Sequence, residues 1–225
     1  KNKMGIINKR KIIATVGPSS IDKNIINKMD EAGVNMFRIN LSHTDLDDFT
    51  TIVKKLRHWT EKPICPDTEG AQLRSSLLCE SIIVDTNDII EFVNKVSLKN
   101  PDNIGISGAD IVSIIFVGDL IKIDFDGVLI QIIDNTSKKI IGQVITGGVI
   151  GNNKGISIDR EIQLACFTKK DIKMMSIAKT MKLDTFYLSF CSTGKDVIEM
   201  REKFDYDIKV ISKVESNKGL YNLEA

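Results

Sequence analysis

The segment VNMFRINLSH, residues 34–43, decides how the first third of the chain folds. It follows Gly33, which is placed to end a helix, and residues 34–41 have the pattern of a strand. Side chains alternate between the two faces of a strand, so Arg38, Asn40 and Ser42 are expected to share one face. The segment therefore predicts a strand that ends in a row of polar side chains.

Strand and helix patterns alternate on both sides of this segment. Asp22 is placed to cap a helix before it, and a second helix is expected from about Asp45. Thr168 and Asp171 form a capping box that opens a further helix. The other predicted elements are strands over residues 11–16, 63–68, 185–190 and 208–214 and a helix over residues 196–204. Such alternation indicates an α/β fold whose strands are parallel and joined by right-handed crossovers.

The pattern changes between residues 75 and 159, where no amphipathic helix is evident. Short apolar strands separated by Asn-Asp, Asp-Gly, Gly-Asp and Gly-Gly turn signals predict a small β-barrel or sandwich. The predicted strands are residues 81–84, 89–93, 111–117, 120–125, 128–133 and 140–145. The expected domains are thus residues 1–74 and 160–225, the two parts of one β/α domain, and residues 75–159, an all-β domain inserted between them.

Composition excludes several classes of protein. The chain has 225 residues, is 42% hydrophobic and 27% charged, and carries a formal net charge of +1, so no general nucleic-acid partner is expected. The apolar runs fall well short of the roughly 20 residues of a membrane helix, and no secretory signal is recognisable, so a cytoplasmic location without a membrane partner is expected. Four separated cysteines are expected to be reduced, small buried side chains rather than zinc ligands or disulfides.

Two further strand ends carry candidate site residues. Lys213 and Glu215 share a face at the end of one strand, an arrangement suited to phosphoryl or enolate chemistry, although a surface salt bridge would look the same. Asp67 and Thr68 end another strand and could offer hard oxygen ligands to a monovalent or divalent cation together with Asn40 and Ser42, or could simply form a cap or turn.

Two glycine-rich segments, residues 147–151 and 152–155, leave a further alternative open. Their backbone amides, with Lys154 beside them, could contact a nucleotide phosphate, but they lack the spacing of a phosphate-binding loop. Both also have the composition of hairpin turns.

In this order, the motifs resemble those of the pyruvate kinase family along almost the whole chain. Residues 37–43 (FRINLSH) are similar to the family segment A-R-L-N-F-S-H, and residues 67–74 (DTEGAQLR) to D-T-K-G-P-E-I-R. Residues 211–215 (ISKVE), with Gly219, resemble I-S-K-I-E-N-x-E-G. The opening strand, KIIATVGPSS over residues 11–20, and the segments 126–127 and 153–155 of the β domain also match.

The resemblance implies a partial TIM (β/α) barrel of about five strands with a small all-β lid domain inserted after the third strand. The implied reaction transfers phosphate between phosphoenolpyruvate and ADP, giving pyruvate and ATP, with Mg²⁺ and usually K⁺. The implied roles by matched position are catalysis by Lys213, substrate binding by Arg38 and Lys213, Mg²⁺ binding by Glu215, K⁺ binding by Asn40, Ser42, Asp67 and Thr68, and nucleotide binding by Asn40, His43, Arg74 and Lys154.

Several positions depart from the family pattern. Glu69, Ala71 and Gln72 stand where the family has Lys, Pro and Glu, and Ser192 stands at a common Arg position. Five barrel strands are predicted where the family has eight, so we expect a fragment, a homo-oligomer or completion by another chain. The alternative functions are a non-catalytic or regulatory relative that binds a nucleotide or phosphorylated metabolite, and an enzyme acting on an enolpyruvate or keto-acid.

Overall fold

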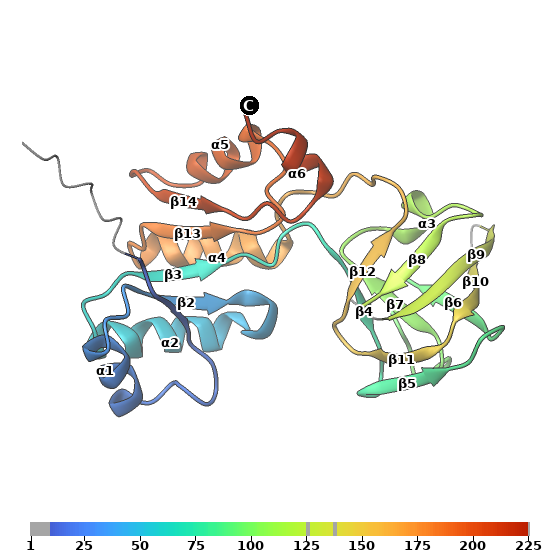
Figure 1. Cartoon of the computed structure of the whole chain (residues 1–225), viewed down its shortest axis with the longest axis horizontal. Coiled ribbons are helices and arrows are strands. Elements are labelled where there is room, and N and C mark those ends of the chain that lie inside the picture. The colour runs from blue at the N-terminus through green and yellow to red at the C-terminus, as the bar shows by residue number, and fades with distance from the viewer. Residues whose placement is uncertain (1–9, 125–126, 137–138, 225) are drawn as a thin grey trace, which may run out of the picture. The chain divides into compact units, whose positions relative to one another are not determined.

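The computed structural model describes residues 10–124, 127–136 and 139–224 (Figure 1). The chain divides into two compact units. The first comprises residues 1–70 and 166–225, and the second comprises residues 71–165. Among the described residues, every helix is too short or too polar to cross a membrane.

The first unit is built on a parallel five-stranded sheet, which confirms the α/β prediction. Its strands lie in the order β1 (Ile13–Thr15), β2 (Met36–Asn40), β3 (Ile64–Asp67), β13 (Thr185–Leu188) and β14 (Lys209–Ser212). Its helices are α1 (Lys23–Glu31), α2 (Leu46–Trp59), α4 (Lys169–Thr180), α5 (Gly194–Glu202) and α6 (Asn217–Tyr221), with a short 3-10 helix, η1 (Leu41–His43), after β2.

Helix starts in this unit follow the capping signals in the sequence. The Asp22 side chain accepts hydrogen bonds from the backbone N–H groups of Asn24 and Ile25 at the start of α1. Asp45 accepts one from Asp48 at the start of α2, and the capping box of Thr168 and Asp171 opens α4. Each cap satisfies donors that the first helical turn leaves without intrahelical partners.

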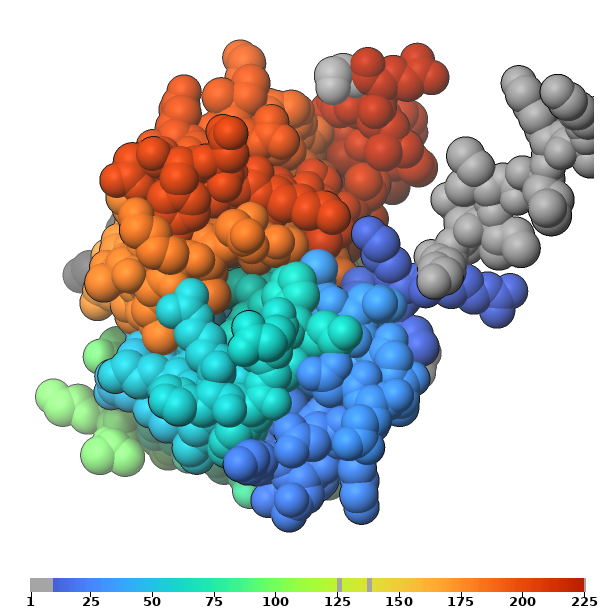
Figure 2. All heavy atoms as spheres, turned by 90° about the vertical axis from the view of Figure 1, so that its left-hand side faces the viewer, coloured from blue at the N-terminus to red at the C-terminus, as the bar shows by residue number. Residues whose placement is uncertain are grey.

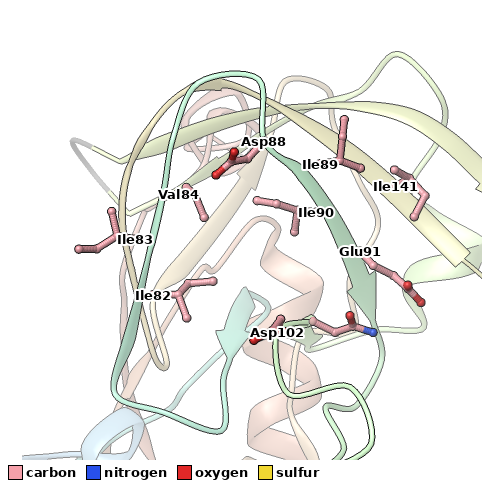
Figure 3. A pocket seen from close by; sticks show the side chains of 10 residues that line it. Ile82, Ile83, Val84, Asp88, Ile89, Ile90, Glu91, Asp102 and Ile141 are labelled. Carbon is pink, nitrogen blue, oxygen red and sulfur yellow. The ribbon is translucent and has the colours of Figure 1, made fainter.

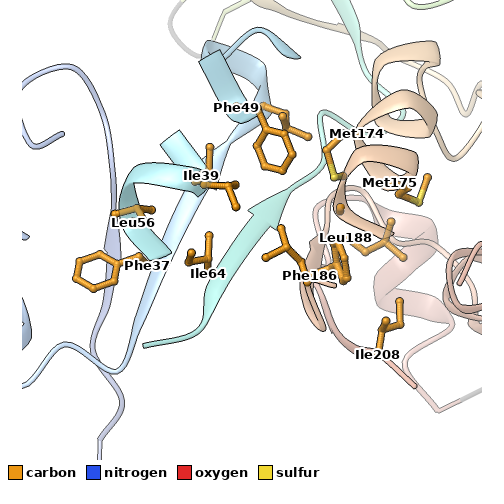
Figure 4. Close-up of a cluster of buried hydrophobic side chains, with 14 of the residues drawn as sticks. Phe37, Ile39, Phe49, Leu56, Ile64, Met174, Met175, Phe186, Leu188 and Ile208 are labelled. Atoms are coloured by element: carbon orange, nitrogen blue, oxygen red, sulfur yellow. The ribbon is translucent and has the colours of Figure 1, made fainter. Parts of the chain in front are cut away.

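Alternation along β2 determines which of its side chains are buried. Phe37 and Ile39 are completely buried in a core shared with Phe49 of α2 and Met174 of α4 (Figure 4). The spheres of the amino-terminal part (blue to cyan) and the carboxyl-terminal part (orange) meet closely in Figure 2. The side chain of Arg38, between the two core residues, belongs to the opposite face of the sheet.

The second unit contains a closed β-barrel in which one pair of neighbouring strands is parallel and the other pairs are antiparallel. Of the barrel and the sandwich expected for this region, it is the barrel. Its strands lie in the order β10 (Lys139–Thr146), β6 (Ile89–Val93), β7 (Ile104–Ser107), β4 (Leu73–Ser76), β12 (Gly155–Ile158), β8 (Leu120–Ile123) and β9 (Val128–Thr136). β5 (Ser81–Val84) pairs with β11 (Gly148–Gly151) in a separate ribbon. Buried isoleucines dominate the barrel interior.

The predicted strand over residues 111–117 is wrong. Ile111–Ile114 form a short helix, α3, whose first amide donates to the Asn94 side chain at 2.9 Å. The Asp119 carboxylate accepts a hydrogen bond from the backbone N–H of Phe116 at 2.8 Å, which turns the chain after the helix. These two side chains satisfy backbone donors at the two ends of the segment, so the apolar run needs no partner strand there.

Strands β4, β7, β11 and β12 escaped prediction. Glycine and polar residues break their apolar pattern. Residues 147–151, interpreted as a turn or phosphate loop, lie largely in β11, whereas residues 152 and 153 form a turn before β12, in agreement with the turn interpretation. One cysteine expectation is also wrong, because Cys79 is exposed, whereas Cys65 and Cys191 are buried. All four thiols are unpaired.

The carboxylate of Asp171 is the main polar connection between α4 and the segment after β3. It is fully buried and accepts hydrogen bonds from the backbone N–H groups of Glu69 (2.8 Å), Gly70 (3.1 Å) and Thr168 (2.9 Å). Burial raises the pKa of this carboxyl group, while the same N–H groups act in the opposite direction.

Replacement of Asp171 by Ala should therefore destabilise the first unit. Three donors lose their acceptor inside the fold, so we expect the free energy of unfolding to fall by about 2–4 kcal/mol. Urea unfolding would measure this change. Asp47→Ala in the exposed first turn of α2 is the matched control, with an expected change within about 0.5 kcal/mol. Equal effects of the two substitutions would contradict the assigned role of Asp171.

Candidate functional site

The carboxyl ends of neighbouring parallel strands bring the predicted polar residues together. Asn40 of β2 lies in register with Asp67 of β3, and Asp67 with Tyr187 of β13. β14, the neighbour of β13, is followed directly by Lys213. Four strands therefore deliver side chains to one edge of the sheet, as expected for a β/α site.

Asp67 is the centre of this cluster. Its fully buried side chain accepts a 2.7 Å hydrogen bond from Arg38 Nε to Oδ2 and also forms an ion pair with Arg38 Nη2. Lys213 Nζ lies 3.0 Å from Oδ1 and 3.1 Å from Oδ2. Ser189 Oγ donates to Oδ1 at 3.1 Å. A buried carboxylate is stable only when its charge is compensated, and here two cations and a hydroxyl compensate it.

Both cations remain accessible from solvent. The side chains of Arg38 and Lys213 are each 26% exposed, in contrast to the buried carboxylate that holds them. Arg38 Nη1 also donates to Thr15 Oγ1 at 3.0 Å, so the guanidinium is held from two neighbouring strands. The arrangement offers two oriented positive groups to an incoming anion.

Glu215 lies beside Lys213, as its place in the strand predicted. Lys213 Nζ is 3.6 Å from Glu215 Oε1, and the backbone N–H of Phe190 donates to Oε2 at 3.0 Å. Phe190 has a φ of +52°, a left-handed backbone conformation that non-glycine residues adopt at some energetic cost. The backbone amide of Phe190, a residue in this costly conformation, therefore holds the Glu215 carboxylate in place.

The oxygen-bearing residues expected to hold a monovalent cation lie on two short segments, residues 40–42 and 67–68. Asn40 Oδ1 accepts a hydrogen bond from the Ser42 backbone N–H at 3.0 Å. Thr68 Oγ1 accepts one from the Ser189 N–H at 3.0 Å. Amide, hydroxyl and carboxylate oxygens are the donors that hard cations prefer, so the chemistry of this set fits such an ion.

Glu215 is the more accessible acidic residue of the cluster, because its side chain is 38% exposed whereas that of Asp67 is fully buried between Arg38 and Lys213. In the part of the chain that the structure describes, no group of three or more His, Cys, Asp or Glu side chains is arranged to enclose a metal. One carboxylate fits Mg²⁺, which keeps most of its other positions for water and substrate oxygens.

The remaining predicted nucleotide ligands are separated in the chain. His43 is exposed in η1 of the first unit. Arg74 and Lys154 belong to the second unit, where Arg74 Nη1 donates to the Asn153 carbonyl at 3.1 Å. Lys154 Nζ lies 2.9 Å from Asp124 Oδ2. β4 and β12 pair antiparallel, which brings Arg74 and Lys154 close to each other.

Sequence reasoning missed Ser189, whose hydroxyl lies within hydrogen-bond distance of both Asp67 and the Thr68 backbone carbonyl and donates to one of them at a time. Ser189 follows β13 directly and shares the alternation of Tyr187, so the rule that selected Asn40 and Ser42 could have found it. Lys170 and Asp171 of α4 were also missed as contacts of the β3 end, and no local pattern marks them, because their partners lie about 100 residues away.

The second unit has a concavity of its own, with a volume of about 600 Å³ (Figure 3). Isoleucine and valine side chains of β5 and β6 line it, together with Asp88, Glu91 and Asp102. None of the predicted site residues is among its lining residues. Its lining residues therefore all come from the second unit, and none of them belongs to the Asp67 cluster.

Comparison with known proteins identifies the family. The family model described as pyruvate kinase, barrel domain, matches residues 7–225. The chain is 27% identical to pyruvate kinase of Thermotoga maritima over 95% of the chain and 48% of that relative. It is 28% identical to pyruvate kinase 2 of Saccharomyces cerevisiae (95% and 45%) and 26% identical to plastidial pyruvate kinase 2 of Arabidopsis thaliana (96% and 39%).

The chain thus spans less than half the length of these curated relatives. The family match nevertheless covers nearly all of its residues and agrees with the α/β architecture. This protein belongs to the pyruvate kinase family.

Proposed function

We propose that the protein takes part in phosphoryl transfer between phosphoenolpyruvate and ADP, giving pyruvate and ATP. The observation that carries the proposal is the placement of Arg38 and Lys213, two partly exposed cations, on one buried carboxylate at the carboxyl edge of the parallel sheet. Phosphoryl transfer depends mainly on positioning and on cations near developing negative charge. Family membership supports the same reaction.

In this proposal each member of the cluster has a distinct task. Arg38 binds the substrate phosphate, and Lys213 stabilises the negative charge of the phosphoryl group during transfer. Asp67 contacts both cations, so it holds them in place before substrate arrives. Preorganised charges of this kind lower the barrier because they need no rearrangement at the moment of reaction.

The charges of the cluster support a requirement for added cations. Arg38 and Lys213 together are balanced by Asp67 and Glu215, so these four side chains have no net positive charge for a phosphate group. We assign Mg²⁺ to Glu215, and K⁺ to Asn40, Ser42, Asp67 and Thr68. When bound, these ions would neutralise phosphate oxygens, and Mg²⁺ would also act as a Lewis acid.

The nucleotide contacts and the domain arrangement complete the proposal. We assign nucleotide contacts to Asn40, His43, Arg74 and Lys154, the last two from the second unit. The five parallel strands are proposed to be part of a TIM barrel, with residues 75–159 as an inserted domain that excludes water during the reaction. The parallel strand order with intervening helices supports the barrel assignment.

Replacement of Lys213 by Met should remove the chemical step. We expect kcat to fall by about 10³-fold, because charge stabilisation in the transition state is lost. Pyruvate formation from phosphoenolpyruvate and ADP with Mg²⁺ and K⁺ measures it. Lys209→Met, an exposed lysine at the opposite end of the same strand, is the control and should change kcat less than about twofold.

Activity that survives Lys213→Met would refute the assigned mechanism. If the unmodified protein forms no pyruvate but shows a thermal shift with ADP or phosphoenolpyruvate, the non-catalytic binding function replaces the proposed one. Turnover of a keto-acid in the absence of ADP would instead support an enolate reaction.

Replacement of Arg38 by Lys tests the binding of substrate phosphate. The charge is retained, but the fork that contacts Asp67 and Thr15 together is lost. We expect KM for phosphoenolpyruvate to rise about tenfold, whereas KM for ADP stays within about twofold. Steady-state kinetics with each substrate varied in turn separates the two constants. A rise in KM for ADP alone would show that Arg38 does not bind the phosphate of phosphoenolpyruvate.

A further inference from the structure

Lys170, near the start of α4, forms two polar contacts and has no role in the reaction proposed for this protein. Its Nζ lies 2.9 Å from Glu69 Oε1, just after β3, and donates to the Leu41 carbonyl oxygen at 2.5 Å, just after β2. Its side chain is 28% exposed and that of Glu69 is 23% exposed, so the ion pair is partly shielded from water. One ammonium group thus connects two strand ends.

The two partners of Lys170 lie next to the residues proposed to bind a monovalent cation. Leu41 lies between Asn40 and Ser42, and Glu69 follows Asp67 and Thr68. These are the two segments, residues 40–42 and 67–68, whose oxygens are proposed to hold a monovalent cation. Lys170 thus binds the middle of one segment and the residue that follows the other, in addition to the pairing of Asn40 with Asp67 in the sheet.

The rest of the α4 start holds one of the segments firmly. Thr168 Oγ1 donates to Glu69 Oε2 at 3.1 Å, and Asp171 accepts from the Glu69 and Gly70 amides. The β3 end is therefore attached to α4 by several bonds. Within the described contacts of α4, Lys170 is the side chain that extends this attachment by hydrogen bond to the end of β2.

The substitution at Glu69 fits this arrangement. A negative charge replaces the lysine expected from the family pattern, next to the proposed cation ligands. Both of its carboxylate oxygens have partners, one in Lys170 and one in Thr168, so its charge is compensated locally. Glu69 therefore serves to orient the lysine rather than to bind an ion itself.

We propose that Lys170 is a positioning residue that sets the spacing between residues 40–42 and residues 67–68. The proposal rests on the proposed function for the role of these segments in cation binding, but the spacing itself can be measured separately. The amide of Ser42 reports on it, because it donates to Asn40 Oδ1 within the segment whose middle carbonyl Lys170 binds.

The test is amide hydrogen exchange, followed by NMR, on the full chain carrying Lys170→Met. The control is Lys173→Met, an exposed lysine about one turn further along the same helix. We expect the Ser42 amide to exchange about tenfold faster in Lys170→Met than in the control, with amides in the middle of α2 unchanged. Lys170→Arg, which keeps a charged donor, should restore most of the protection.

A second measurement addresses the consequence for function. The K⁺ concentration that gives half-maximal pyruvate formation should rise about tenfold in Lys170→Met, with kcat at saturating K⁺ changed less than about threefold. If Lys170→Met does not fold, Glu69→Gln provides the test, because it weakens the hold on the ammonium without removing it.

The two proposals fail in different ways. Unchanged Ser42 exchange, or acceleration of all amides to the same extent, would overturn the positioning role, since the latter is the result of a general loss of stability. Absence of pyruvate formation or of any K⁺ effect in the unmodified protein would count against the proposed function, while the exchange result would still decide whether Lys170 spaces the segments.

Discussion

The buried carboxylate of Asp67 is the constraint around which the first unit is arranged. A charge with no solvent exposure must be compensated, and its partners come from β2, from the end of β13 and from the end of β14. Strands distant in sequence are therefore tied together at the same edge. The same requirement keeps two cations oriented at a point that solvent can reach, so structural and functional demands coincide there.

A second set of polar contacts holds the edge from the helix side. The start of α4 uses Asp171 to bind backbone amides after β3 and Lys170 to reach the carbonyl after β2. The capping box thus has an additional task besides starting a helix, because its Asp171 also accepts bonds from the neighbouring segment. The backbone beside the site is fixed by these contacts as well as by sheet hydrogen bonds.

The environment of Cys65 shows how the cluster affects its neighbours. This thiol lies on β3, two residues before Asp67, and is buried. Burial, together with the nearby Asp67 charge, raises its pKa to about 12, so the thiol stays protonated and unreactive at neutral pH. The cysteine next to the cluster therefore serves as packing, in agreement with its expected role, and the chemistry is left to the charged residues.

Sequence alone determined the periodic elements of the first unit, because capping residues such as Asp22 and Thr168 and the alternation along β2 act locally. It also placed Arg38, Asn40, Asp67 and Lys213 at strand ends. Sequence-based prediction failed where the apolar pattern is weak, as in the glycine-containing strands β11 and β12, or where distant side chains satisfy the backbone, as at α3. Only the tertiary structure decided that Asp67 holds both cations and that Lys170 compensates Glu69. These pairings join residues 29 to 146 positions apart, and long-range contacts of this kind leave no periodic trace in the sequence.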